Sequence, residues 1–409
     1  MGLNDTPRGE RLHIALFGKR NAGKSSIINA LTNQNIAIVS DQKGTTTDPV
    51  YKAMELLPLG PVVMIDTPGL DDEGDLGLLR VKKAKEVLAK TDVALIVVDA
   101  ASGISSFEDE LIKEMKQKNV PFLLLLNKND LLFHEVGKKE LKNSLSSQYD
   151  TTVLFVSALT GEGIEEVKEE LGKYEKTRED QEKRIVADLL EPGDFVVLVV
   201  PIDKAAPKGR LILPQQQTIR DILDAGAVSI VCRDTELADT LNRLGEKPKL
   251  IITDSQAFGK VSKIVPRDML LTSFSILFAR YKGELNDLIE GARTLSTLDN
   301  GDKILMAEGC THHRQCDDIG TVKIPNWIRK YTDKDIVIET SSGTGFPEDL
   351  TPYKMIVHCG GCTLNEKEMK SRIARAKEQG IPMVNYGILI AYMNGILERS
   401  IEPFGEIQL

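Results

Sequence analysis

Short apolar runs alternate with helix-patterned segments along most of the chain. In the first part, apolar runs of strand length occupy Leu12–Phe17, Val62–Ile65, Ala94–Asp99, Phe122–Leu126 and Val153–Val156. Helical patterns begin at Lys24 and recur at Leu79–Leu88 and Glu108–Lys118. Strands that alternate with helices are typical of βαβ units with a mostly parallel sheet. We therefore expect an α/β domain over residues 1–175.

Two smaller segments repeat this alternation after a charged run, Lys173–Lys183, which we expect to be a solvated helix end or a linker. Residues 185–270 predict a small α/β domain for assembly, with strands at Phe195–Ile202, Arg210–Leu213, Ser229–Cys232 and Leu250–Thr253. Residues 271–409 predict a further small α/β domain, with strands at Lys303–Met306, Ile336–Glu339, Lys354–Val357 and Met383–Val384. Expected helices are Thr218–Leu223, Glu236–Leu244, Asn286–Leu298, Glu366–Gln379 and Ile388–Glu398.

Composition narrows the class of protein. The chain has 409 residues and a formal net charge of -9. Because nucleic-acid binding needs a basic footprint, we expect no nucleic-acid partner. The apolar runs have strand length and are too short to span a membrane, so we expect no membrane association. Met1–Arg11 is polar and has no apolar core of a signal peptide, which favours a cytoplasmic protein.

A phosphate-binding loop follows the first predicted strand. The sequence from Gly18 to Ser25 is GKRNAGKS, which fits the pattern G-x4-G-K-S and opens a helix. Backbone N–H groups of such a loop hold phosphates, the lysine reaches the β- and γ-phosphate oxygens, and the serine hydroxyl binds Mg²⁺. We expect this loop to bind the nucleotide through Gly18, Asn21, Ala22, Gly23, Lys24, Ser25 and Ser26.

Two further segments predict the catalytic part of a nucleotide hydrolase. Asp66-Thr67-Pro68-Gly69 follows a buried strand, where the carboxylate can hold Mg²⁺ through water and the glycine N–H can meet the γ-phosphate. Lys43–Asp48 lies in the position of a switch loop whose threonine completes the Mg²⁺ shell. We assign that threonine as Thr46, with Thr45 as the alternative. Lys24, Thr46, Asp66 and Gly69 are the expected catalytic residues.

The base is expected to be guanine. Asn127-Lys128-Asn129-Asp130 ends a predicted strand, and the Asp130 carboxylate can accept both N1–H and the 2-amino group of guanine. Adenine offers no such pair of donors. Ser157-Ala158-Leu159 follows the next strand, where a backbone N–H can meet the guanine O6. The five segments in this order predict a Ras-like GTPase domain that hydrolyses GTP.

Two details refine the type of GTPase. Leu70 stands where a Ras-type enzyme has a glutamine that orients water, so another device must do this. Together with the Gly44-Thr45-Thr46-Thr47-Asp48 segment, Asn21 resembles the Era/TrmE-like GTPases. In that family the asparagine helps to hold K⁺ between the phosphates, so the resemblance implies potassium activation. The alternative is that Asn21 only tolerates a left-handed turn.

Cysteines and histidines gather after two strands of the last segment. Cys310-Thr311-His312 follows Lys303–Met306, and His358-Cys359-Gly360-Gly361-Cys362 follows Lys354–Val357. Ligand sites in parallel sheets lie beyond the carboxyl ends of strands, so these groups can converge. The spacing fits an iron–sulfur cluster with three thiolates, a zinc site with three cysteines and a histidine, or buried cysteines without metal.

With these motifs the whole chain resembles the FeFe-hydrogenase maturation GTPases, the HydF family. Supporting stretches are Val200–Arg210 and Cys316–Gly320. The resemblance implies a 4Fe–4S cluster on Cys310, Cys359 and Cys362, with an exchangeable fourth ligand and with His312 and His358 nearby. It also implies a homodimer through the middle domain. The implied function is a scaffold and carrier that receives the diiron subcluster of the H-cluster, made with radical-SAM maturases, and delivers it to the FeFe-hydrogenase apoprotein.

Two other functions remain open from the sequence. One is an Era/TrmE-type GTPase that acts on tRNA or the ribosome, although the acidic balance of the chain disfavours it. The other is a zinc-stabilised regulatory GTPase without a redox role, in which the C-terminal cysteines hold zinc.

Overall fold

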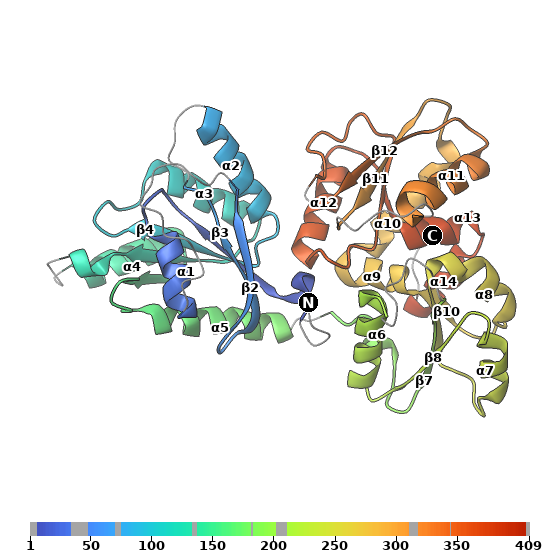
Figure 1. Ribbon diagram of the computed structural model, residues 1–409. Helices are drawn as coiled ribbons and strands as arrows, with labels where there is room; N and C mark the ends of the chain where they lie inside the picture. The colour runs from blue at the N-terminus through green and yellow to red at the C-terminus, as the bar shows by residue number, and fades with distance from the viewer. Residues whose placement is uncertain are drawn as a thin grey trace. The chain divides into compact units, whose positions relative to one another are not determined.

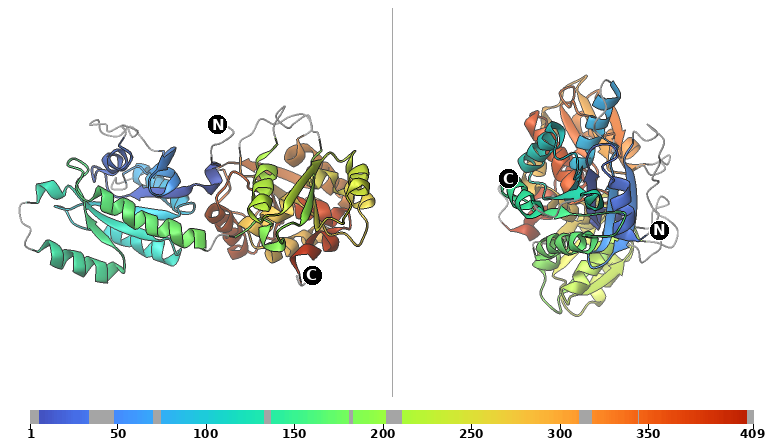
Figure 2. Two further views of the ribbon diagram at one scale, coloured as in Figure 1. Left: turned by 90° about the horizontal axis from the view of Figure 1, so that it is seen from below. Right: turned by 90° about the vertical axis from the view of Figure 1, so that its left-hand side faces the viewer.

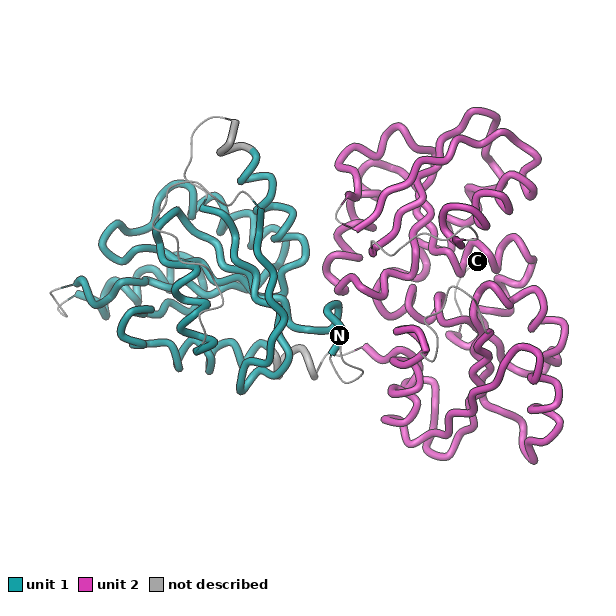
Figure 3. Tube along the Cα trace, in the orientation of Figure 1, with its two compact units in different colours: residues 1–182 teal, residues 183–409 magenta. Residues whose placement is uncertain are grey.

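The computed structural model describes residues 6–33, 48–69, 75–132, 137–180, 183–201, 211–310, 318–343 and 345–405. The chain forms two compact units, Met1–Glu182 and Lys183–Leu409, which are coloured separately in Figure 3. Among the described helices, none is long and apolar enough to cross a membrane.

The first unit is built on a six-stranded sheet with strand order β2-β3-β1-β4-β5-β6. Of the six described strands, β2 alone runs antiparallel, to its neighbour β3. The inner strands carry apolar side chains on both faces because helices cover both faces of a parallel sheet. The strands are β1 (Leu12–Phe17), β2 (Val50–Leu56), β3 (Gly60–Asp66), β4 (Val93–Asp99), β5 (Phe122–Asn127) and β6 (Val153–Phe155).

Helices cover this sheet on its two sides (Figure 1). Apolar residues of α1 and α5 pack on one face, and those of α2, α3 and α4 pack on the other. The helices are α1 (Lys24–Thr32), α2 (Asp75–Leu88), α3 (Ser106–Gln117), α4 (Lys138–Tyr149) and α5 (Ile164–Asp180). This arrangement confirms the expected α/β fold of the first domain.

The second unit contains two four-stranded sheets in which all paired strands are parallel. Their orders are β10-β9-β7-β8 and β12-β11-β13-β14. The first sheet comprises β7 (Phe195–Val199), β8 (Val228–Cys232), β9 (Leu250–Thr253) and β10 (Leu271–Ser273). The second comprises β11 (Lys303–Glu308), β12 (Val337–Ser342), β13 (Met355–His358) and β14 (Met383–Asn385).

One hydrophobic core runs through both sheets of this unit. It includes Ile251 of β9, Ile276 of α9, Leu288 of α10 and Met306 of β11. Figure 2 shows the strands and helices of this unit from two further directions. Because α9 and α10 contribute to this shared core, they hold the two sheets together. The helices are α6 (Leu213–Asp224), α7 (Leu237–Arg243), α8 (Phe258–Ile264), α9 (Phe274–Lys282), α10 (Leu285–Arg293), α11 (Ile324–Thr332), α12 (Glu366–Glu378), α13 (Tyr386–Met393) and α14 (Leu397–Ile401).

Two expected elements of this unit are wrong. The strand expected at Arg210–Leu213 is absent from its described part, since Leu213 begins α6, with Pro214 in the first turn and the Gln215 side chain accepting the Ile212 N–H. The fourth strand of this sheet is instead β10, which lies just beyond the expected domain boundary at residue 270. The helix expected at Ile388–Glu398 is interrupted at Gly395, whose φ of +66° is left-handed.

Candidate functional site

The predicted phosphate loop joins β1 to α1 and is packed tightly against neighbouring strands. Gly18 has a φ of +145°, and a Cβ atom there would lie 2.1 Å from the Val97 carbonyl oxygen. Gly23 has a φ of +94°, and its Cβ atom would lie 2.2 Å from Nδ2 of Asn127. Only glycine fits at either position, so the backbone itself forms the surface that a phosphate would meet.

Lys24 stands at the first position of α1, and its side chain is bent over the loop. The buried ammonium donates hydrogen bonds to the carbonyl oxygens of Gly18 and Lys19, both at 2.8 Å. The loop therefore carries a cation beside the N-terminus of a helix. This combination attracts phosphate, because the helix dipole and the ammonium both favour negative charge.

A serine and an aspartate from separate elements meet beside the loop. The Ser25 hydroxyl donates to Oδ2 of Asp66, at the end of β3, at 2.5 Å. Burial raises the pKa of Asp66, and the Ser25 bond and the Lys24 charge oppose that rise. The other oxygen of Asp66, Oδ1, is buried and has no hydrogen-bond partner within the described part of the chain. Buried oxygens normally have a partner, and a hydroxyl with a carboxylate suits Mg²⁺ and its bound water.

The residues predicted to bind guanine are held in one network. Asn127 donates from Nδ2 to the Ala22 carbonyl at 2.8 Å, and its Oδ1 accepts the Ala158 N–H at 3.2 Å. Asn127 thus links the phosphate loop to the loop that follows β6. The Ser157 hydroxyl donates to Oδ1 of Asp130 at 2.6 Å, and Asp130 is exposed. The carboxylate is therefore oriented by protein and open to a base.

Two contacts that support this network were not predicted. Lys128, with a φ of +63°, donates to Oδ2 of Asp99 at 2.7 Å. Burial raises the pKa of Asp99, but the bond and charge of Lys128 and the backbone N–H groups of Ala101 and Ser102 together outweigh burial, so the pKa is lowered. Asn129 donates to Oε1 of Glu162 at 2.8 Å. The position of Asp99 at the end of β4 was the available signal.

The other predicted nucleotide residues have mixed outcomes. A Cβ atom on Gly69 would lie 2.7 Å from Cα of Arg20, so this glycine lies directly against the phosphate loop. Asn21 has a left-handed φ of +59°. Leu159 is 85% exposed, which leaves only its backbone for a base contact. Ser26 is half-buried on α1. Several residues named from the sequence lie outside the described residues, among them Thr46 and its alternative Thr45, Leu70, His312 and Cys316.

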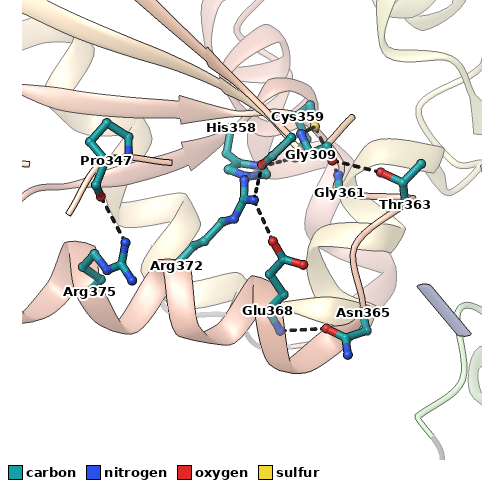
Figure 4. Close-up of polar contacts among 11 residues, drawn as sticks. Gly309, Pro347, His358, Cys359, Gly361, Thr363, Asn365, Glu368, Arg372 and Arg375 are labelled. Atoms are coloured by element: carbon teal, nitrogen blue, oxygen red, sulfur yellow. Dashed lines mark hydrogen bonds and ion pairs between the residues drawn. The ribbon is translucent and has the colours of Figure 1, made fainter. Parts of the chain in front are cut away.

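The predicted cysteine groups leave adjacent strands at the same edge of the second sheet. Parallel pairing places Ala307 of β11 beside His358 of β13, so Gly309-Cys310 and Cys359 follow at neighbouring strand ends. The Thr363 hydroxyl donates to the Gly309 carbonyl at 3.2 Å and ties the two loops together (Figure 4). The convergence expected from the sequence is therefore present for these cysteines.

Backbone N–H groups surround one of the sulfur atoms. Sγ of Cys359 accepts hydrogen bonds from the N–H of Gly309 at 3.1 Å and of Gly361 at 3.4 Å. Burial raises the pKa of this thiol to about 12; these two bonds oppose the rise, and charges on Cys362 and Cys310 would add to it. None of these three cysteines forms a disulfide.

A buried lysine lies under the loop that carries Cys362. Nζ of Lys282, at the end of α9, donates to the carbonyl oxygens of Gly361 at 3.3 Å, Cys362 at 3.2 Å and Leu364 at 2.7 Å. Burial raises the pKa of Cys362, and the Lys282 charge opposes this rise. The loop is therefore held in one conformation by a cation that favours a thiolate.

Tyr386, the first residue of α13, brings an unpartnered hydroxyl to this region. It is 5% exposed, and within the described part of the chain its hydroxyl has no hydrogen-bond partner. A Cβ atom on Gly320 would lie 2.4 Å both from this hydroxyl and from Oε1 of Glu308, so the glycine leaves room for two oxygens. Burial raises the pKa of Tyr386 well above its usual value, and a charge on Cys359 adds to the effect.

His358 lies next to Cys359, and both of its ring nitrogens face protein groups. It is fully buried; its Nδ1 lies 2.7 Å from the Cys359 carbonyl oxygen, and its Nε2 lies 3.1 Å from Nη1 of Arg372. Burial, assisted by the Arg372 charge, lowers the pKa of His358 to about 3. Both ring nitrogens contact protein, so His358 offers none to a metal in this arrangement. No group of three or more His, Cys, Asp or Glu side chains among the described residues is arranged to hold a metal ion.

The fold and the nucleotide site define a class: a Ras-like phosphate-loop GTPase followed by two smaller α/β domains. Comparison with family models agrees, since residues 13–128 match a model described as a 50S ribosome-binding GTPase. Residues 185–283 match the hydrogen maturase F dimerization domain, and residues 286–403 match the hydrogen maturase F tetramerization domain. The chain belongs to the hydrogen maturase F family, and its matched domains support self-association.

Curated relatives resemble a smaller part of the chain. The tRNA modification GTPase MnmE of Clostridioides difficile is 33% identical over 165 residues, which is 40% of this chain and 34% of that protein. GTPase Der of Nitratidesulfovibrio vulgaris is 36% identical over 166 residues, or 39% and 33% of the two chains. The chain thus spans about a third of the length of these relatives. Among solved structures, Era of Aquifex aeolicus bound to GDP and AlF4⁻ aligns with a TM-score of 0.37 and 20% identity, covering 57% of this chain and 98% of that one.

Proposed function

We propose that this chain is a GTP-hydrolysing iron–sulfur scaffold and carrier that assembles the diiron subcluster of the H-cluster and delivers it to FeFe-hydrogenase. Family membership supports hydrogenase maturation by a GTPase. The observation that carries the finer proposal is the pair Cys310 and Cys359 at adjacent strand ends, with two backbone N–H groups donating to Sγ of Cys359. The proposed partners are the FeFe-hydrogenase apoprotein, radical-SAM maturases and a second copy of this chain.

The proposed nucleotide chemistry uses the first unit. Lys24 would contact the β- and γ-phosphates, Ser25 and Asp66 would hold Mg²⁺, and Asp130 would select guanine. The unpartnered Oδ1 of Asp66 fits this proposal, because Mg²⁺-bound water would give it a donor. Asn21 would help to hold K⁺ beside the phosphates. Mg²⁺ and K⁺ would supply positive charge as the bond to the γ-phosphate breaks.

The proposed cluster site uses the thiolates of Cys310, Cys359 and Cys362. Soft thiolate ligands and N–H donors to sulfur suit a 4Fe–4S cluster, so the donor set fits the group. Three thiolates leave one iron for an exchangeable ligand, which is the chemistry that a scaffold requires. The chain's own contribution would be to hold the cysteine loop in place, through Lys282 below it and Thr363 beside it.

The names of the curated relatives favour a second candidate, a GTPase that acts on tRNA or the ribosome. Their likeness covers about two fifths of this chain, however, whereas the hydrogen maturase F domains account for residues 185–283 and 286–403. A zinc-stabilised regulatory GTPase is the third alternative, since three cysteines with a further ligand also suit Zn²⁺. The metal content of the purified protein separates these functions.

The test is to purify the full chain without oxygen, to measure iron, sulfide, zinc and RNA, and to record EPR and Mössbauer spectra. We expect about four irons per chain, the count of a 4Fe–4S cluster, and activation of apo-hydrogenase. Cys359→Ser should lose most of the iron and all activation but keep GTP hydrolysis, because the GTPase domain is a separate unit. Cys232→Ala, which removes a buried thiol of β8, is the matched control and should change neither. Zinc in place of iron, or co-purified RNA without a metal, would support the alternatives.

A further inference from the structure

A buried line of polar contacts connects α12 to the cysteine loop (Figure 4). Oε1 of Glu368 accepts from Nη2 of Arg372 at 2.8 Å, and Nη1 of Arg372 lies 3.1 Å from Nε2 of His358. Nδ1 of His358 lies 2.7 Å from the Cys359 carbonyl oxygen. Three side chains thus form a continuous path from the first turns of a helix to the backbone of a proposed cluster ligand.

The protonation of His358 follows from its partners. A guanidinium group has donors and no acceptor, so Nε2 of His358 must be unprotonated where it meets Arg372. The ring proton therefore resides on Nδ1, which donates it to the Cys359 carbonyl. Arg372 fixes which nitrogen carries the proton, and both nitrogens are used. This geometry gives His358 a structural partner on each side and leaves no lone pair for iron.

Arg372 is itself held from several directions. Its Nη2 also donates to the Gly343 carbonyl at 2.6 Å, directly after β12, and its guanidinium stacks on the Phe346 ring with 5.1 Å to the ring centre. Arg372 is 5% exposed. A buried arginine with several fixed bonds has little freedom to move, and the carboxylate of Glu368 compensates its charge.

The start of α12 sets the register between this path and the cysteines. Asn365, three residues after Cys362, caps the helix by accepting the Glu368 N–H at 2.9 Å. The cap therefore fixes where α12 begins after the Cys359–Cys362 loop, and with it the position of Glu368 relative to that loop. The cap holds one end of the loop, and the hydrogen bond between Nδ1 of His358 and the Cys359 carbonyl oxygen holds the other.

The Cys359 carbonyl is the point where this path acts on the sulfur. It belongs to the peptide that begins the turn through Gly360 and Gly361, and Gly361 has a left-handed φ of +61°. That turn brings the Gly361 N–H to Sγ of Cys359. A carbonyl held by His358 fixes the plane of the peptide between Cys359 and Gly360, which directly precedes the peptide whose N–H, that of Gly361, meets the sulfur.

We propose that Arg372, acting through His358, is a positioning residue for the Cys359 thiolate, and that His358 is not a ligand of the cluster. The proposal rests on the proposed function, because it requires Cys359 to bind the cluster. Partners that orient metal ligands typically change metal affinity or activity by about 10- to 100-fold when they are removed.

The test compares two arginines of α12 in the full chain, reconstituted with iron and sulfide without oxygen. Arg372→Gln removes the donor to His358. Arg375→Gln is the matched control, because Arg375 also stacks on Phe346, at 5.8 Å, and donates to a backbone carbonyl, that of Pro347 at 3.1 Å. The arginine that contacts Nε2 of His358 is Arg372. The readouts are iron release to a chelator, the EPR spectrum and reduction potential of the cluster, and the melting of the apoprotein.

We expect Arg372→Gln to release iron about tenfold faster than the wild-type chain or more, with altered EPR g-values and a shifted potential. Arg375→Gln should match the wild type in all three. Arg372→Lys, which restores one donor to Nε2, should recover part of the difference. His358→Asn keeps a donor near the Cys359 carbonyl and should retain the cluster. Its pulsed EPR spectrum should show the same nitrogen couplings as that of the wild-type chain.

Three results would overturn the proposal. Identical spectra and release rates for Arg372→Gln and Arg375→Gln would remove the positioning role, and loss of a strong nitrogen coupling in His358→Asn would make His358 a ligand. If Arg372→Gln does not fold, Arg372→Lys and His358→Asn decide by the same measures. A wild-type chain that takes up no iron–sulfur cluster would instead refute the proposed function, and the positioning role with it.

Discussion

Replacement of Asp130 by asparagine tests the guanine site directly. The Asp130 side chain is exposed and is oriented by the Ser157 hydroxyl, which donates to its Oδ1 at 2.6 Å. Bound guanine would give the carboxylate two N–H donors. Asp130→Asn keeps the size of the side chain but removes its charge and turns one acceptor into a donor, which would face a donor of the base.

The structure gives the expected magnitude. Each hydrogen bond to a charged group contributes about 1.5–3 kcal/mol, so loss of two bonds should weaken GTP binding by about 3–6 kcal/mol. At 1.4 kcal/mol per tenfold change, the dissociation constant should rise by about 10²- to 10⁴-fold. Xanthosine triphosphate presents an acceptor at the 2-position, and its affinity should rise. Because Asp130 is exposed, the thermal stability of the nucleotide-free protein should change little.

Competition against a fluorescent GTP analogue measures both affinities, with Mg²⁺ present and salt held constant. The control is Asp150→Asn, which makes the same chemical change at an exposed aspartate directly after α4. It should leave GTP and xanthosine triphosphate binding unchanged. Equal GTP affinity in Asp130→Asn and the wild type would remove Asp130 from the base site, and the reasoning from its orientation by Ser157 would be wrong.

Three further predictions concern other regions. K⁺ should raise GTP hydrolysis over Na⁺, and Asn21→Ala should abolish the difference; equal wild-type rates in both salts would contradict the potassium proposal. Tyr386→Phe should stabilise the apoprotein against denaturant by about 1 kcal/mol, because it removes a buried hydroxyl that has no partner among the described residues; a loss of similar size would show that the hydroxyl is satisfied. Val231→Lys should weaken self-association about tenfold in sedimentation equilibrium. Val231 is 46% exposed on β8, which among the described strands is an edge strand of the sheet β10-β9-β7-β8. An unchanged dissociation constant of self-association would place the contact elsewhere.

The nucleotide site could be predicted from the sequence because its residues lie in short motifs directly after strands. The strand end fixes where each motif emerges, and parallel strands bring their ends to one edge. Asn127 and Asp130 follow β5, and Asp66 ends β3, as expected. The Lys128–Asp99 ion pair was missed because, although Asp99 ends an expected strand, a single sequence does not show that this strand lies beside the strand that precedes Lys128.

Elements with weak periodicity were less predictable. β2 was not expected because most of its side chains are at least partly exposed, so it lacks a continuous apolar run. The apolar letters at 211–213 predicted a strand, although Pro214 and the Gln215 cap start a helix there. In both cases the outcome depends on what covers the segment or ends it, and hydrophobic pattern alone does not contain that information.

The role of His358 shows a different limit. Its position beside Cys359 predicted a place near a metal, and its place near the cysteines agrees with that expectation. Its partner Arg372 lies 14 residues away on a helix, and the bond between them depends on how α12 packs on the sheet. Histidine next to cysteine therefore predicts proximity to a site, whereas the choice between ligand and positioning residue requires the partner of each ring nitrogen.

Among the described residues, several buried polar atoms that lack a partner lie in regions where a ligand or a second chain is proposed. Oδ1 of Asp66 lies beside the phosphate loop, the Tyr386 hydroxyl lies near the cysteines, and Gln217 and Ser229 lie on α6 and β8 of the domain that matches the dimerization model. A buried group without a partner costs about 1–3 kcal/mol, so each of these regions is less stable than its packing alone would make it. A ligand that satisfies the group stabilises the region by mass action. The melting temperature of the first unit should therefore rise with GTP and Mg²⁺ and should not change with cluster reconstitution. The melting temperature of the second unit should rise with cluster reconstitution and with protein concentration and should not change with GTP.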